Sequence, residues 1–122
     1  MRNTSVESVA RRSSPAPHPT DPSKEIVFTC LEGNESGTYC RGTDTLVNGV
    51  CTIELPEEFR LVSEVEEITA QVTALEGPAM LWVEHQSRER VVVRGTGDVS
   101  FNWLVNGVRR GFADRENIRE NI

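Results

Sequence analysis

The chain has 122 residues, of which 37% are hydrophobic and 26% charged, and its formal net charge is −6 at pH 7. This length is enough for one domain with a real core and leaves no room for a second domain. Residues 1–24 carry four basic and two acidic side chains, so their charge is +2 and −8 remains on residues 25–122. An acidic body repels phosphate, so we expect no nucleic-acid partner.

The chain has no apolar run that approaches the length of a membrane span. Its N-terminus also lacks the apolar core of about 7–15 residues that is typical of a signal peptide. We therefore expect synthesis in a cytoplasm without classical secretion, and no membrane partner.

Residues 1–24 are predicted to be an extended leader, because the run from Ser13 to Pro22 is rich in Pro and Ser and has almost nothing to bury. Such a run prefers polyproline II and extended forms. It is either a solvated tail or a segment that lies along a larger scaffold protein. In the second case, the residues predicted to bind the scaffold are Arg2, Arg11, Arg12, Pro15, Pro17, Pro19 and Pro22.

Asn48-Gly49 is the strongest hairpin signal in the chain, because both central residues of a type I′ turn need φ > 0. Cys51, Ile53 and Leu55 then alternate with polar or outward positions, as in a strand with one buried face. Pro56 ends this strand, since proline removes a ladder donor.

Similar alternation predicts seven short strands. They cover residues 26–31, 38–47 (with an alternative break at Gly42), 50–55, 68–74, 80–84, 90–94 and 99–106. Residues 57–67 could hold a short helical turn in which Phe59 and Val62 face inward. We predict an all-β domain over residues 25–112, built as an antiparallel β-sandwich or barrel.

The predicted core consists of the apolar residues on the inner faces of these segments. They are Ile53, Leu55, Phe59, Val72, Leu81, Val83, Val91, Val93, Phe101 and Trp103. Other apolar residues lie opposite this face, which indicates a second layer or another chain. The resulting candidates for an oligomer interface are Met80, Trp82, Val92 and Leu104.

The three cysteines, Cys30, Cys40 and Cys51, include no CxxC pair. Cys30 and Cys51 fall on apolar faces of predicted strands, which favours buried free thiols. A Cys30–Cys40 disulfide is the alternative.

Residues 113–122 form a charged C-terminal tail with Ile118 and Ile122 four positions apart. This spacing predicts one or two helical turns with a narrow apolar stripe. A helix this short must dock on another surface or fray.

The search for catalytic chemistry is negative. His18 and His85 have no second ligand at metal-binding spacing, and the carboxylates at 57–58 and 64–67 match no Ca²⁺ loop. Residues 95–97 lack the third glycine of a phosphate-binding loop. We therefore expect no enzyme, no cofactor and no metal site.

The order of several short motifs resembles a family of small β-modules. These modules recur at or near the C-termini of phage tail-fibre-like proteins and of related bacterial surface or appendage proteins. The motifs are Asn48-Gly49, residues 52–56, Phe59, residues 71–73, Gly77, residues 81–83, residues 91–95, residues 99–103, Val105, Gly107, Arg109 and residues 111–112.

The resemblance covers about residues 42–112. It implies structural and attachment roles, often in trimers, and no catalytic residues. Two departures are Cys51, where such modules usually show a small residue, and the leader of 24 residues in place of a long fibre. Both favour a small fibre tip, adaptor or decoration protein.

We therefore expect a structural component of a phage virion or phage-like appendage, located on the virion or on an extracellular appendage. It would self-associate through the β-module, with a trimer favoured, and would be anchored on a scaffold protein by its leader. The alternative is a free-standing module that binds a protein or a glycan through its loops.

Overall fold

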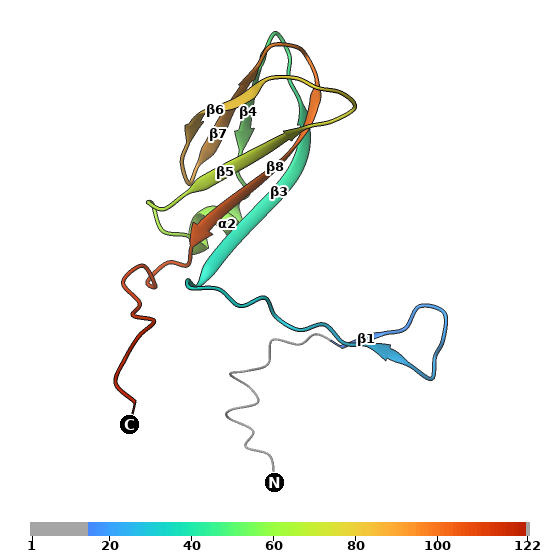
Figure 1. Ribbon diagram of the computed structural model, residues 1–122, viewed down its shortest axis with the longest axis vertical. Coiled ribbons are helices and arrows are strands. Elements are labelled where there is room, and N and C mark those ends of the chain that lie inside the picture. Colours follow the sequence, from blue (N-terminus) through green and yellow to red (C-terminus); the bar gives the residue numbers. More distant parts are fainter. Residues whose placement is uncertain (1–14, 122) are drawn as a thin grey trace. The chain divides into compact units, whose positions relative to one another are not determined.

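Two three-stranded antiparallel sheets face each other and form a β-sandwich (Figure 1). The computed structural model describes residues 15–121. The chain divides into two units, residues 1–33 and residues 34–122, and the sandwich belongs to the second. No helix in the described part of the chain is long and apolar enough to cross a membrane.

The first sheet, called the β8 sheet, has the strand order β3-β8-β5. The long strands β3 (Gly37–Thr45) and β8 (Ser100–Val108) pair along their full length, and β5 (Thr69–Ala74) pairs with the other edge of β8. β3 is continuous, so the alternative of a break at Gly42 is wrong.

The second sheet, called the β7 sheet, has the order β4-β7-β6. β7 (Arg90–Gly95) pairs with β4 (Val50–Glu54) on one side and with β6 (Leu81–Gln86) on the other. The all-β sandwich prediction is confirmed in this outline, and the barrel alternative is wrong because the two sheets stay separate.

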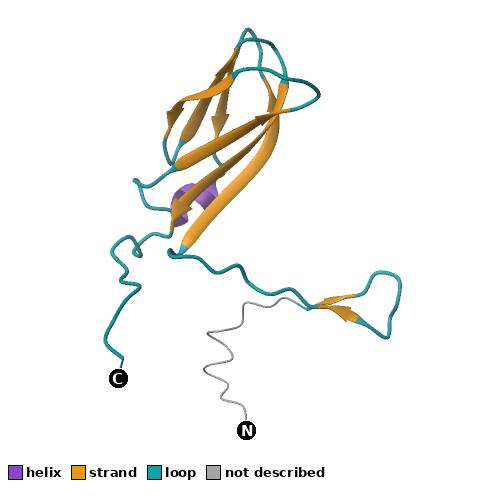
Figure 2. Ribbon diagram, in the orientation of Figure 1, coloured by secondary structure: helices purple, strands orange, loops and turns teal. Residues whose placement is uncertain are grey.

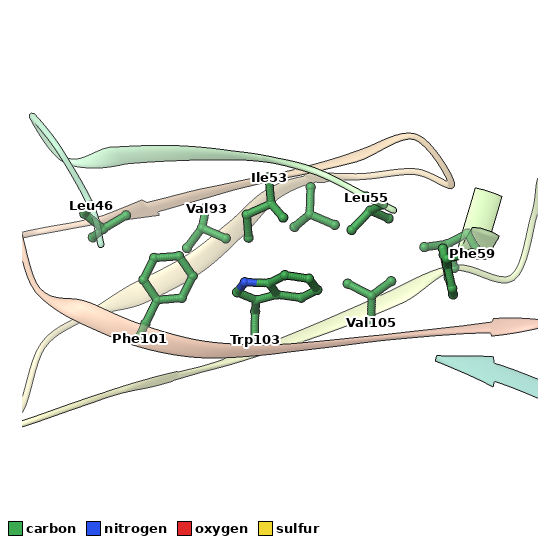
Figure 3. Close-up of a cluster of buried hydrophobic side chains, with 10 residues drawn as sticks. Leu46, Ile53, Leu55, Phe59, Val93, Phe101, Trp103 and Val105 are labelled. Carbon is green, nitrogen blue, oxygen red and sulfur yellow. The ribbon is translucent and has the colours of Figure 1, made fainter. Parts of the chain in front are cut away.

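The core lies between the sheets. Figure 3 shows Phe101, Trp103 and Val105 pointing from β8 toward Val93 and Ile53 on the opposite sheet. Seven predicted core residues are buried: Ile53, Leu55, Phe59, Val91, Val93, Phe101 and Trp103. The other three, Val72, Leu81 and Val83, are partly buried against this cluster. Leu46 and Ile68 are also buried, although they were not predicted as core.

Gly42 has a specific role beside Trp103, its direct partner on β8. A Cβ atom at Gly42 would lie 2.7 Å from Cζ2 of the indole. The absence of a side chain therefore lets the ring lie across β3, where its Nε1 donates a hydrogen bond to Asp44 Oδ2 at 2.8 Å.

The Asn48-Gly49 turn forms as the sequence predicts, with φ of 55° at Asn48 and 78° at Gly49. The Asp98 carboxylate accepts hydrogen bonds from both backbone amides, at 3.1 Å from Asn48 N and 2.9 Å from Gly49 N. This contact joins the β3–β4 hairpin to the loop before β8.

A short helix of six residues, α2 (Glu57–Val62), follows Pro56 and is the purple element in Figure 2. Its Phe59 is buried in the core as predicted, whereas Val62 is 48% exposed, so the prediction that Val62 faces inward is wrong. Directly after the helix, the fully buried Ser63 hydroxyl lies 2.7 Å from the Thr38 hydroxyl.

The first unit differs from the sequence prediction. Ala16–Pro17 (β1) and Glu25–Ile26 (β2) pair as a small antiparallel hairpin, so residues 16–26 fold back rather than run extended. Residues 27–36 contain no strand, and the predicted strand 26–31 is wrong. Phe28 and Leu31 are 62% and 94% exposed, because an alternating pattern cannot form a buried face without a partner strand.

The predicted C-terminal helix is also wrong, since the described residues 113–121 contain turns and loops only. Ile118 is 91% exposed. A segment of this length is marginal as a helix, and Ile122, the second residue of the predicted stripe, lies outside the described residues.

Candidate interaction surfaces

The outer face of the β7 sheet carries an apolar group around Trp82. We call Val50, Met80, Trp82 and Val92 the tryptophan face. Trp82 and Val50 both pair with Arg94 of β7, and Val92 lies two residues away on the same side of that strand. Trp82 is 46% exposed and Met80 is 68% exposed. Val50 and Val92 are partly buried, and large apolar side chains such as Trp82 that stay exposed on a sheet are found at interaction sites.

The charged residues around this face are paired with each other. Arg94 Nε lies 2.9 Å from Glu84 Oε1, and Arg90 Nε lies 3.1 Å from Glu54 Oε1. Exposed pairs of this kind add little to stability. Arg94 lies between Val50 and Trp82 on the sheet and is neutralised by Glu84, so a partner that covers the tryptophan face covers an ion pair rather than an unpaired arginine.

Three further exposed apolar side chains lie in α2 or just after it. We call Leu61, Val62 and Val65 the helix patch, and they are 60%, 48% and 63% exposed. Beside it, a groove of about 370 Å³ runs between α2 and β3 and includes Tyr39 in its lining. The polar composition of residues 57–67 obscured this patch in the sequence.

The outer face of the β8 sheet is polar. Two cross-strand rows define it: Arg41, Leu104 and Gln71 in one, and Thr43, Asn102 and Thr73 in the next. We call these six residues the polar face. They line a groove of about 450 Å³. Thr43 Oγ1 donates a hydrogen bond of 2.8 Å to Asn102 Oδ1.

The four predicted interface residues do not form one surface. Met80, Trp82 and Val92 lie on the tryptophan face, whereas Leu104 lies in the polar face on the other sheet. Among the predicted leader contacts, Pro17 lies in β1, and Pro15, Pro19 and Pro22 lie beside or within the hairpin. Arg2, Arg11 and Arg12 lie outside the described residues.

The cysteines are all free thiols, so the Cys30–Cys40 disulfide is absent. Cys30 is exposed, contrary to the prediction of a buried strand residue, while Cys40 and Cys51 are partly buried. Burial, with Glu58 nearby, raises the pKa of Cys40 to about 11. Burial and the Asp44 carboxylate also raise the pKa of Cys51. Neither thiol is therefore activated as a nucleophile.

Within residues 15–121, no group of three or more His, Cys, Asp or Glu side chains is placed to hold a metal ion. His18 has a structural contact instead, because its Nδ1 accepts a hydrogen bond from Asp21 N at 3.1 Å. Glu64, from the acidic run, accepts one from Gly111 N at 2.8 Å. Glu66 and Glu67, which follow in the sequence, line an open groove of about 650 Å³.

No protein-family model, no curated protein and no solved structure matches this chain. The surfaces are therefore interpreted from their own chemistry.

Proposed function

We propose that this chain is a structural component of a phage virion or phage-like appendage, a fibre tip, adaptor or decoration protein without enzymatic activity. It forms a trimer through its sandwich and is anchored on a scaffold protein by its N-terminal leader. The observation that carries the proposal is Trp82, a tryptophan left 46% exposed on the outer face of the β7 sheet, with the apolar Val92 two residues from its neighbour Arg94.

Trp82 has the properties of an interface anchor. Tryptophan is enriched among the residues that dominate binding energy, and these residues work best where surrounding contacts exclude water. Its direct cross-strand neighbour is Arg94, which is already paired with Glu84, and Val92 lies two residues from Arg94 on the same side of β7. A second copy of the chain can therefore cover Trp82 without stripping water from an unpaired arginine.

A trimer requires two different complementary surfaces on each subunit, because a three-fold ring is built from heterologous contacts. The tryptophan face and the helix patch are two such apolar surfaces on different elements of the sandwich. In the proposed trimer, the tryptophan face of one subunit packs on the helix patch of the next.

The leader supplies the proposed anchor. Pro15, Pro17, Pro19 and Pro22 have fixed φ angles, which lowers the entropy lost when the segment docks. Arginines at positions 2, 11 and 12 can pair with acidic groups of the scaffold, so attachment should weaken as salt concentration rises.

Deleting residues 2–22 separates anchoring from self-association. We expect the truncated protein to keep the native mass of the full chain and to be lost from the purified particle or appendage fraction. A full chain with Arg2, Arg11 and Arg12 changed to Gln should show an intermediate, salt-sensitive loss. If the deletion variant still co-purifies with the particle at wild-type level, the leader is a solvated tail and the anchor lies elsewhere.

A further inference from the structure

The polar face has the composition of a binding groove for a sugar. Its two rows present one guanidinium, two amides and two hydroxyl groups around a single apolar side chain, Leu104. The groove volume of about 450 Å³ falls within the range of small-ligand sites, roughly 300–1,000 Å³. Hydroxyl and amide groups both donate and accept hydrogen bonds, which matches a polyhydroxylated ligand.

The positive charge of Arg41 favours a ligand that carries a negative charge. It is exposed at the centre of β3 and forms no ion pair within residues 15–121, unlike Arg88, Arg90 and Arg94. It is also the only charged residue in the groove lining. A guanidinium binds a carboxylate through two parallel hydrogen bonds. We propose that the polar face binds a glycan through a sugar that carries a carboxylate, and that Arg41 holds this group.

Asn102 is already oriented for such a ligand. Because Thr43 donates to Asn102 Oδ1, the amide nitrogen of Asn102 keeps both of its protons for another acceptor. In the neighbouring row, Leu104 lies between Arg41 and Gln71. Its apolar side chain offers a contact for the C–H surface of a sugar ring, with polar groups on either side for the ring's hydroxyls.

Two other classes of ligand fit this groove less well. A nucleic acid or another polyanion would meet a body with a net charge of −8 over residues 25–122 and only one arginine in the groove. A protein interface would need a more apolar centre than Leu104 and the mostly buried Trp103 provide. An uncharged, hydroxyl-rich sugar chain with a single carboxylate matches both the single arginine and the polar lining of the groove.

A glycan site on the polar face would be an additional function of the chain. It is compatible with the proposed structural function because the polar face and the tryptophan face lie on different sheets. Assembly through the tryptophan face leaves the polar face open. Three copies on one appendage would then bind a repetitive glycan with greater avidity than a single copy.

The test is calorimetric titration of the full chain with three oligosaccharides that carry one carboxylate each: an aldobiouronic acid, an aldotriouronic acid and 3′-sialyllactose. The methyl ester of each serves as the ligand control. We expect at least one acid to bind, its ester to bind tenfold or more weakly, and Arg41→Gln to weaken binding of the acid by a similar factor. Asn102→Ala should reduce the affinity severalfold.

Arg119→Gln is the matched protein control, since it makes the same charge change outside the groove and should leave affinity unchanged. Amide chemical shifts should move at Thr43, Gln71 and Asn102 when the acid binds. The proposal is overturned if no acid binds by about 10 mM, if the ester binds as well as the acid, or if Arg41→Gln behaves like Arg119→Gln. A loss of native mass in Arg41→Gln would instead assign this face to contacts between copies, which also overturns it. Binding by a chain that proves monomeric would contradict the trimer and leave the glycan site standing.

Discussion

The two tryptophans illustrate how differently one residue type is used in this fold. Trp103 is 8% exposed in the core, whereas Trp82 is 46% exposed on an outer face. Replacing Trp103 by Ala should lower the free energy of unfolding by about 3–5 kcal/mol, because it leaves a large cavity. Trp82→Ala is the control and should cost less than about 1 kcal/mol per monomer. Urea denaturation of the two variants at low protein concentration measures both values, and equal losses would contradict the assignment of Trp103 to the core.

Gly42 should be intolerant of any side chain. In Gly42→Ala, the new Cβ would lie 2.7 Å from the indole of Trp103, so the ring must shift within a packed core. We expect a loss of about 1–3 kcal/mol in the free energy of unfolding, as is typical of overpacking. Gly97→Ala is the matched control, because no atom lies within 4 Å of its Cβ position. Thermal unfolding of both variants checks this, and a Gly42→Ala protein as stable as Gly97→Ala would show that the indole lies elsewhere.

The raised pKa of Cys40 predicts both its reactivity and its effect on stability. The folded thiol keeps its proton up to about pH 11, against an ordinary value of 9.0, so the folded chain binds more protons than the unfolded chain between these values. Its contribution to stability should therefore be complete below about pH 9 and be lost as the pH rises to about 11.

Alkylation with iodoacetamide at pH 8, followed by peptide mass mapping, tests the thiols directly. The exposed Cys30 should react first, and Cys40 and Cys51 should react slowly because burial disfavours their thiolates. In denaturant all three should react at similar rates. Equal rates in the native protein would contradict the described burial of Cys40 and Cys51.

At the scale of elements, Asp98 links two parts of the chain that lie 50 residues apart. Its carboxylate accepts hydrogen bonds from the amides of Asn48 and Gly49. Both hydrogen bonds are exposed to water, so Asp98→Ala should destabilise the sandwich by about 0.5–2 kcal/mol, as does the loss of a capping side chain. Glu116→Ala, in the exposed tail, is the control for the lost charge. Urea denaturation that gives both variants the same midpoint would contradict this role of Asp98.

Apolar segments between turn signals predicted the six sandwich strands, and alternation is clearest where a strand has one buried face. Phe101, Trp103 and Val105 on β8 are the clearest example. The same pattern failed at residues 26–31, where Phe28 lies in a segment that pairs with no sheet. The predicted C-terminal helix failed for a related reason, since Ile118 is 91% exposed. A pattern records which residues could be buried together, but only a partner surface makes that burial happen.

The surfaces of the whole molecule were less predictable than its core. Leu104 and Trp82 look alike in the sequence, as apolar residues opposite the core face, yet they lie on different sheets. Sheet order decides this, and no local pattern reveals that β8 lies between β3 and β5. The rows that join Arg41, Leu104 and Gln71 likewise depend on register between distant strands. The polar face therefore became visible only in the folded chain.

The central claim for the whole molecule is that the tryptophan face of one copy packs on the helix patch of the next. Native mass spectrometry of the full chain tests it with two variants, Trp82→Arg and Leu61→Asp, and with Thr73→Ala in the polar face as the control.

The wild type and the control should show three times the monomer mass of 13.6 kDa. Each interface variant alone should be monomeric, because every contact in a three-fold ring contains the altered surface. An equal mixture of the two variants should form a heterodimer, since one intact pair of surfaces remains. A wild-type chain that stays monomeric, or a Trp82→Arg variant that stays trimeric, would contradict this account.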